Sequence, residues 1–254
     1  MLPFSPARFG NPAALAGARW SPLAFSPLGW WDAQQQSLGN GDALTSISDG
    51  SGNNRPLTEA TNPGAFSTTG LNGHPEFQFD GVNDKASRAD NCGWTNNAFT
   101  MWCVGRLRGS TSARSPLFTL DGAHFIGIEA NTFSTAGSKW GLSQHAHTFD
   151  LTAATSTAPV IYIWRVSAAT VGSSNIISVS NISINGSAQT LTRRFTGTGD
   201  DLWSASAASL TFTRMGNFAT VFGNVGVGEA GFCQSDIGAA GEAQLYAYLA
   251  AKWA

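Results

Sequence analysis

The sequence carries little charge. Asp, Glu, Lys and Arg together make up 12% of the 254 residues, against about 25% in an ordinary soluble protein. The net charge is −2, and the 14 basic residues are scattered apart from Arg193-Arg194. Because nucleic-acid binding relies on clustered basic residues that neutralise phosphates, we expect no nucleic-acid partner.

Cysteines and long apolar runs are also scarce. The three cysteines, Cys92, Cys103 and Cys233, form no C-x-x-C pair. This pattern supports neither a zinc site nor a disulfide framework, and it predicts three buried thiols. No apolar run approaches the roughly 18 residues that a membrane-spanning helix needs. We therefore expect no insertion into a membrane.

The N-terminal stretch lacks an uninterrupted apolar leader, since prolines break it repeatedly, and it does not resemble a secretory signal. Proline continues to recur up to residue 28, without periodicity. We predict an extended arm at 1–28, followed by one domain at 29–254. Four aromatic side chains of the arm are too apolar to stay in water, and we predict that they anchor it: Phe4, Phe9, Trp20 and Phe25.

Hydrophobic and aromatic residues are plentiful, at 42% and with nine tryptophans, which excludes general disorder. Short runs with strand-like alternation recur between turn residues, as in "PEFQF" at 75–79. Asp121-Gly122 and Asn185-Gly186 lie between such runs and predict hairpins. Seven or more strands at this spacing predict an all-β antiparallel sandwich.

The end of the chain departs from the β pattern. Leu245, Tyr248, Leu249 and Trp253 recur at helical spacing, with alanines between them. We predict one short C-terminal α-helix that begins near Gly238 and packs its apolar stripe on the domain.

Two acidic segments resemble parts of metal sites. Asp80 to Asp84 follows a predicted strand and has the Asp-Gly and Asn-Asp composition of a tight turn. Asp49 to Asn53 alternates oxygen-bearing residues, but Asn54 and Ala60 replace the Gly and Glu that an EF-hand loop needs. We predict turns at both places, with no metal and no cofactor, and whether Ca²⁺ occupies either turn stays open.

The spacing of carboxylates does not match a glycosidase. A retaining mechanism needs two carboxyl groups about 5 Å apart, and residues two positions apart on one strand share a face. Glu76 and Asp80 come nearest, but Gln78 between them is an amide. Glu129 and Glu229 have no carboxylate two residues away. We therefore predict no catalytic residues and a protein that is not an enzyme.

Tryptophans in polar surroundings are the remaining candidate site. Trp94, Trp140 and Trp203 each lie among Asn, Gly, Ser or Asp. Such indoles stack on sugar rings while neighbouring polar groups bond the hydroxyls, so we predict a glycan-contact set that also includes Asn96 and His145. The alternative, that each ring packs over an edge of the sandwich, has equal weight.

Several motifs together resemble one family: "GWWDA" at 29–33, "LNGHPEFQFDGVND" at 71–84, "SINGS" at 183–187, "VGEAG" at 227–231 and "YLAAKW" at 248–253. Their order is similar to that of the concanavalin A-like lectin/glucanase superfamily, in the LamG-like form found in bacteriophage and bacterial surface proteins. The resemblance covers roughly residues 25 to 254. It implies a two-sheet jelly-roll sandwich with a C-terminal helix packed outside, and frequently contact with carbohydrate.

The neutral composition without an export signal, taken with this resemblance, predicts a non-enzymatic phage virion protein. It would be a tail fibre, a receptor-binding subunit, or a head decoration or head fibre protein, made in the host cytoplasm and exposed after lysis. The arm would bind other virion proteins, the domain would bind host-surface polysaccharide, and we expect a homo-oligomer such as a trimer. The alternatives are a polysaccharide-cleaving enzyme of the same superfamily and a ligand-free capsid cement protein.

Overall fold

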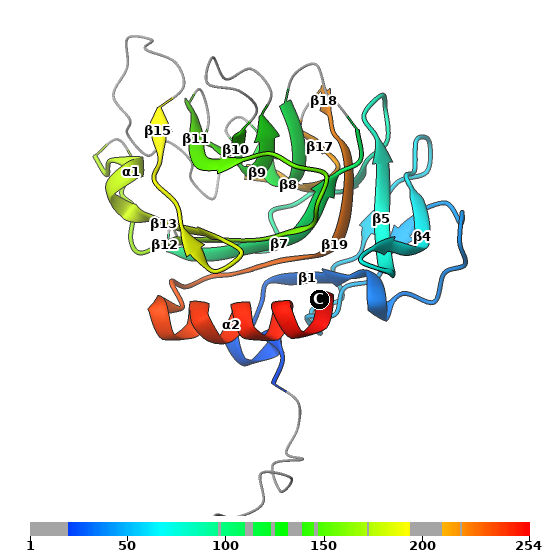
Figure 1. Cartoon of the computed structure of the whole chain (residues 1–254), viewed down its shortest axis with the longest axis horizontal. Helices are drawn as coiled ribbons and strands as arrows, with labels where there is room; N and C mark the ends of the chain where they lie inside the picture. Colours follow the sequence, from blue (N-terminus) through cyan, green and yellow to red (C-terminus); the bar gives the residue numbers. More distant parts are fainter. Residues whose placement is uncertain are drawn as a thin grey trace, which may run out of the picture.

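Two antiparallel β-sheets stack face to face, and one long helix lies outside them (Figure 1). The structure, a computed structural model, describes residues 20–95, 98–109, 114–122, 125–131, 139–144, 147–171, 173–193, 210–218 and 220–254. This architecture confirms the predicted all-β sandwich with one C-terminal helix. No helix of the described ranges combines the length and apolarity needed to cross a membrane.

The first sheet has eight strands in the order β14-β13-β12-β7-β19-β5-β4, and β1 pairs with β19 beside this path. The strands are β1 (Gly29–Asp32), β4 (Ala65–Leu71), β5 (His74–Asp80), β7 (Phe99–Leu107), β12 (Val160–Val166), β13 (Ser180–Ile184), β14 (Ser187–Ala188) and β19 (Asn224–Cys233). The first half of β19 pairs with β5 and its second half pairs with β1.

The second sheet has nine strands in the order β15-β11-β10-β9-β8-β16-β6-β3-β2, and a separate hairpin joins β17 to β18. The strands are β2 (Ser46–Ile47), β3 (Leu57–Thr58), β6 (Ala86–Arg88), β8 (Arg114–Gly122), β9 (Phe125–Asn131), β10 (Lys139–Gln144), β11 (His147–Ala154), β15 (Thr192–Arg193), β16 (Leu210–Met215), β17 (Asn217–Phe218) and β18 (Val221–Phe222). Both predicted hairpins form, β8 with β9 and β13 with β14.

Aromatic side chains fill the space between the sheets. Phe77 and Phe79 of β5 are fully buried there, as their alternation predicts. Trp31 packs against Phe118 of the second sheet with ring centroids 5.6 Å apart. The predicted burial of all three cysteines is confirmed, and their thiols are free.

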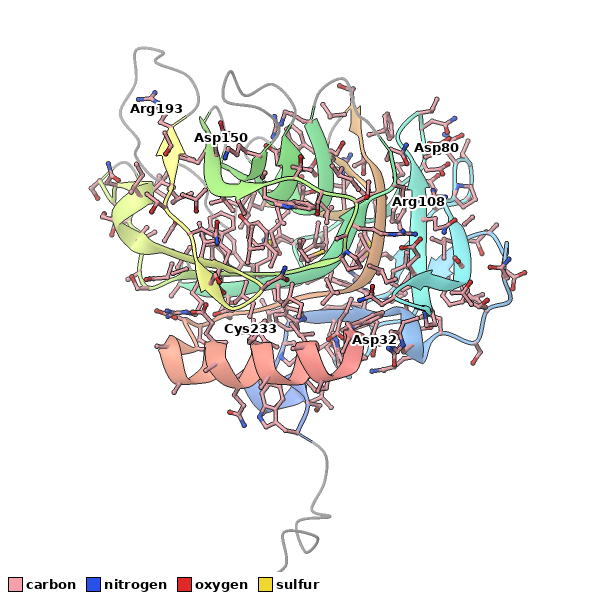
Figure 2. The ribbon with its side chains drawn as sticks, in the orientation of Figure 1. Asp32, Asp80, Arg108, Asp150, Arg193 and Cys233 are labelled. Atoms are coloured by element: carbon pink, nitrogen blue, oxygen red, sulfur yellow. The ribbon has the colours of Figure 1, made fainter. Side chains whose placement is uncertain are left out.

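The first acidic segment, Asp80 to Asp84, forms the turn after β5. One carboxylate oxygen of Asp80 accepts the backbone N–H groups of Val82 (2.8 Å), Asn83 (3.3 Å) and Asp84 (3.4 Å). Gly81 takes a φ of +80°, which favours glycine. Asp80 therefore serves to close the strand, as predicted, and Figure 2 shows it at the far end of β5 from the helix.

Within the described residues, four helical segments accompany the sheets: η2 (Pro22–Phe25), η3 (Ala33–Gln35), α1 (Ile176–Val179) and α2 (Gly238–Trp253). Helix α2 begins at the predicted residue and lies along the outer face of the first sheet (Figure 1). Leu245, Leu249 and Trp253 are buried against that face, while Tyr248 is half-buried. Glu242 of α2 accepts a hydrogen bond from the guanidinium of Arg165 in β12 at 2.6 Å.

Residues 20–28, the described end of the predicted arm, lie against the domain. The backbone N–H of Leu28 donates to the carbonyl of Phe232 in β19 at 2.8 Å. The ring of Phe25 approaches Gly241 of α2, and Trp20 packs edge-on against Tyr248 with centroids 5.5 Å apart. Phe4 and Phe9 fall outside the described residues.

Candidate functional site

A pocket of about 930 Å³ lies between α2, β1, η3 and the N-terminal segment. Its volume is within the range of roughly 300–1,000 Å³ that is typical of small-ligand sites. The lining combines aromatic rings, amides and one ion pair: Trp20, Ser21, Trp30, Asp32, Gln34, Gln35, Gln244, Ala247, Tyr248, Ala251 and Lys252. We call this site the helix pocket.

The pattern of β1 explains one wall of the helix pocket. Successive side chains of a strand point to opposite faces, so Trp30 and Asp32 face α2 while Trp31 enters the core. The opposite wall comes from α2, where Gln244, Tyr248 and Lys252 recur every four residues and therefore share one face. Figure 2 shows Asp32 between the first sheet and the end of α2.

An ammonium group held by two carboxylates forms the floor of the pocket. The Nζ of Lys252 donates to Asp32, to Glu229 at 2.7 Å and to the hydroxyl of Tyr248 at 3.2 Å. The indole N–H groups of Trp30 (2.7 Å) and Trp253 (3.1 Å) also donate to Glu229. Glu229 is fully buried below the lining, and Asp32 stands directly opposite it across β1 and β19.

Burial and charge shift the titration of this floor. Burial raises the pKa of Glu229, and the nearby charge of Lys252 opposes this only in part. Burial alone would lower the pKa of Lys252, but the carboxylates of Glu229 and Asp32 outweigh it and raise that pKa. Burial, with the charge of Glu229, raises the pKa of Tyr248 to about 12. Lys252 is therefore charged across the physiological range.

Sharing one cation distinguishes Asp32 and Glu229 from other buried carboxylates of the described residues. Three others each have an arginine at ion-pair distance: Glu76 with Arg106 (2.8 Å), Asp121 with Arg214 (3.0 Å) and Glu129 with Arg114 (2.7 Å). Each of these three carboxylates therefore has at least one arginine of its own to compensate its charge. The floor of the helix pocket holds one more carboxylate than it has cations.

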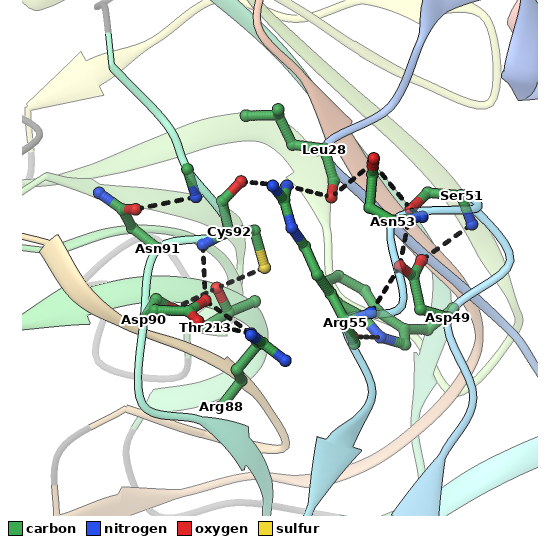
Figure 3. Close-up of polar contacts among 12 residues, drawn as sticks. Leu28, Asp49, Ser51, Asn53, Arg55, Arg88, Asp90, Asn91, Cys92 and Thr213 are labelled. Carbon is green, nitrogen blue, oxygen red and sulfur yellow. Dashed lines mark hydrogen bonds and ion pairs between the residues drawn. The ribbon is translucent and has the colours of Figure 1, made fainter.

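A polar network around Asp49 (Figure 3) fixes the start of β1, and its bond to the backbone of Trp30 thereby positions that residue. One oxygen of Asp49 accepts the backbone N–H of Trp30 at 3.1 Å and of Ser51 at 2.8 Å. The other accepts the hydroxyl of Ser51 at 2.7 Å and the backbone N–H of Arg55 at 2.9 Å. Both oxygens already serve two donors each, which agrees with the predicted structural turn at Asp49 to Asn53.

The same network holds the N-terminal segment. The guanidinium of Arg55 donates to the carbonyl of Leu28 at 2.7 Å and to that of Cys92, as Figure 3 shows. The side-chain amide of Asn53 donates to the carbonyl of Pro27 at 2.9 Å. These contacts lead the chain from η2 into β1 along one path, which keeps Trp20 and Trp30 on the same side of the first sheet.

Of the predicted glycan contacts, the two that the structure describes do not line the helix pocket. Trp94 and Trp140 are each only 1% exposed and pack inside the sandwich, so their rings are not open to a ligand. Both rings belong to the hydrophobic core, whereas the alternative placed them over an edge of the sandwich. Asn96, His145 and Trp203 fall outside the described residues. Of the predicted anchoring residues, Trp20 lines the pocket and Phe25 packs beside it, with centroids 5.3 Å apart.

Local signals for the helix pocket are present in the sequence, but each is short. Alternation in "GWWDA" places Trp30 and Asp32 on one face, and the spacing of Gln244, Tyr248 and Lys252 places these three on another. Tyr248 also falls on the apolar stripe of the predicted helix, and nothing in the local spacing connects the two segments. Their meeting depends on the pairing of β1 with β19, which local spacing does not encode.

No protein-family model and no curated protein sequence matches the chain. Among solved structures, an arabinofuranosidase complexed with arabinofuranosyl-α-1,2-xylobiose is similar with a TM-score of 0.61 at 10% identity, covering 89% of this chain and 63% of that one. Trypanosoma rangeli sialidase with the inhibitor DANA is similar with a TM-score of 0.56 at 11% identity, covering 86% and 32%. The chain thus spans about a third of the sialidase's length.

A GH54 α-L-arabinofuranosidase variant soaked with 4-nitrophenyl α-L-arabinofuranoside gives a TM-score of 0.56 at 15% identity, covering 82% of this chain and 51% of that one. At these identities the likeness establishes the sandwich fold alone. It nevertheless overturns the prediction that the chain is not an enzyme, because glycoside hydrolase structures contain this fold. The exclusion relied on carboxylate spacing within one strand, whereas Asp32 and Glu229 meet across two strands.

Proposed function

We propose that this protein binds carbohydrate in the helix pocket. The observation that carries the proposal is the lining, in which the partly exposed rings of Trp20 and Tyr248 lie with amide side chains above a fixed ion pair. Aromatic rings stack against the C–H faces of sugars, and amides exchange hydrogen bonds with sugar hydroxyls. The similar folds of a sialidase and of arabinofuranosidases support the proposal at the level of the fold.

Filling the pocket tests this function. Ala247 is exposed and lines the pocket, so Ala247→Trp places a large ring inside it. Ala243 is exposed one turn earlier on α2 and does not line the pocket, which makes Ala243→Trp the matched control. Calorimetric titration with a panel of oligosaccharides should show at least about a tenfold weaker affinity for Ala247→Trp. Equal affinities in both variants would show that the binding site lies outside the helix pocket.

Glycoside hydrolysis at the same pocket is the second candidate function. Asp32 and Glu229 contact one ammonium nitrogen, so their carboxyl groups are close enough for the separation of about 5 Å that retaining enzymes use. Burial raises the pKa of Glu229, as a general acid requires. Glu229 lies beneath Trp30 and Trp253, so a bound sugar would reach Asp32 first.

Release of reducing ends from the same oligosaccharide panel tests hydrolysis. Asp32→Asn removes one of the two carboxylates and should abolish any release, while Ala243→Trp should not change it. Release that persists in Asp32→Asn would show that the pocket is not the catalytic centre.

The biological setting that we propose is a phage particle, with the protein as an oligomeric subunit held by its N-terminal arm. The neutral composition and the proline-rich start of the chain support it, and several weak sugar contacts would add up through avidity. A protein without residues 1–19 should stay folded and should no longer sediment with particles. Co-sedimentation of the shortened protein would contradict the anchoring role.

A further inference from the structure

Few charges line the helix pocket, and they are arranged in an unusual way. Among the described lining residues, Lys252 is the cation and Asp32 is the anion. Glu229 adds a second carboxylate directly below them. An exposed lysine in a sugar pocket would attract the carboxylate of an acidic sugar. The contacts of Lys252 decide whether it can do so here.

The hydrogen-bonding capacity of Lys252 is used within the protein. An ammonium group has three N–H donors and no acceptor. Its three partners are Asp32, Glu229 and the hydroxyl of Tyr248. A ligand carboxylate could bind Lys252 only by displacing one of these groups. Displacement from Glu229 would leave a fully buried carboxylate without its cation, which is strongly unfavourable.

The net charge of the floor also disfavours the binding of a ligand anion. If Glu229 is protonated, Asp32 balances Lys252, and if Glu229 is ionised, the floor is negative. In neither state is the floor positive. A ligand anion would therefore meet either no attraction or repulsion within a few ångströms, where screening by salt is weak for buried groups.

The groups that remain available to a ligand are neutral. Gln244 is exposed on the rim of the pocket, and Gln34 and Gln35 of η3 are exposed in the lining. The amide nitrogen of Gln35 donates to Asp32 and that of Gln34 donates to the carbonyl of Lys252, so these two side chains offer mainly their carbonyl oxygens to a ligand. The hydroxyl of Tyr248 accepts from Lys252, which leaves its own hydrogen for a ligand oxygen. These groups suit the hydroxyl and acetamido substituents of uncharged sugars.

We infer that the helix pocket selects neutral sugars and rejects acidic ones, because its lysine is neutralised from within the protein. This selectivity rests on the proposed function and names the substrate class of that site. Neutral hexose, pentose and N-acetylhexosamine units fit it, whereas uronic and sialic acids do not.

Paired neutral and acidic oligosaccharides test this inference by calorimetric titration. The pairs are xylohexaose with hexagalacturonate, and lactose with sialyllactose. The wild type should bind the neutral member at least about tenfold more tightly. Asp32→Asn removes one negative charge, while its side-chain carbonyl can still accept the N–H of Gln34. It should improve binding of the acidic member about tenfold. Asp42→Asn, at an exposed carboxylate outside the pocket, changes the net charge equally and should have no effect.

A second variant covers the case in which Asp32→Asn does not fold. Gln244→Lys adds a cation on the exposed rim and should also improve binding of acidic sugars, whereas Ala243→Lys, outside the lining, should not. Equal wild-type affinity for both members of each pair would overturn the selectivity and leave the carbohydrate function standing. Rejection of acidic sugars that neither Asp32→Asn nor Gln244→Lys relieves would overturn the charge mechanism. Absence of all sugar binding would overturn both proposals.

Discussion

The backbone of β19 changes register at Gly228, between Val227 and Glu229. Such a bulge re-aims the next side chain, and here it turns Glu229 toward α2. A Cβ at position 228 would lie 2.6 Å from ring carbons of Trp253. Trp253 is buried and donates to Glu229, so its ring cannot move away freely. Glycine at 228 therefore permits both the bulge and the floor of the helix pocket.

Gly228→Ala should lower the free energy of unfolding by about 1–3 kcal/mol, the usual cost of overpacking. Gly39→Ala is the control, because Gly39 is exposed and the nearest atom to its added Cβ is the end of the Asp42 side chain at 3.3 Å. Urea denaturation of the two variants measures the difference. Equal stability of both would show that the ring of Trp253 adapts.

The hydroxyl of Tyr248 should make stability depend on alkaline pH. Its pKa is about 12 in the folded protein because of burial and the charge of Glu229, whereas a free tyrosine titrates near 10. The folded state keeps this proton longer, so its contribution to stability is complete below pH ~10 and is lost as pH rises through the folded pKa. After allowance for partial exposure, we expect a loss of roughly 1–2 kcal/mol.

Denaturation at several pH values between about 8 and 12, compared for the wild type and Tyr248→Phe, measures this contribution. The wild type should lose more stability than Tyr248→Phe over that interval. Tyr246→Phe, on the same helix outside the pocket lining, should follow the wild type. An identical dependence of the unfolding free energy on pH in all three proteins would place the pKa of Tyr248 near its ordinary value.

At the scale of elements, the N-terminal segment behaves as part of the sandwich from Trp20 onward. Residues 20–28 pack on α2 and bond to β19 and to Arg55. Deletion of residues 1–19 gives the reference protein, whose unfolding free energy is measured first. Deleting residues 1–28 should lower it by roughly 2–4 kcal/mol, because two partly buried aromatic side chains are lost. Equal thermal stability of the two shortened proteins, measured by circular dichroism, would contradict this division.

The elements that the sequence predicts well have local causes. Asn185 and Gly186 adopt φ values of 50° and 75°, which a type I′ turn requires and these residue types favour. The stripe of Leu245, Leu249 and Trp253 predicts α2 in the same way. Trp94 and Trp140 were less predictable, since polar neighbours in sequence do not reveal whether a large ring turns inward. Burial of an aromatic ring depends on whether the opposite sheet leaves space for it.

At the scale of the molecule, the helix pocket illustrates a second limit. Trp30, Tyr248 and Glu229 come from three distant parts of the chain, and they meet because β1 joins the edge of β19 while α2 returns over both. Sequence patterns predicted the sandwich and the helix, but not which strand receives β1. This pairing also brings Asp32 and Glu229 together, so the spacing of acids within one strand does not reveal them.

The three thiols should report on unfolding of the whole molecule. All are buried, and burial raises their pKa values, for Cys92 to about 11. Thiolate is the reactive form, so none should react with a disulfide reagent at pH ~8 in the native state. All three should react after denaturation in urea. Cys103 lies on β7, between β12 and β19 in the first sheet, and it should react only with global unfolding. Rapid native labelling of Cys103 would reveal an opening of the sandwich.

The place of Trp20 has a mechanical consequence. This residue belongs to the N-terminal segment of residues 20–28 and also lines the helix pocket, where its ring contacts Tyr248 edge-on. A force applied at Trp20 would act directly on this contact between the two rings. A tether attached at this residue would pull on a wall of the helix pocket, so mechanical load and the proposed ligand would act on the same pair of rings.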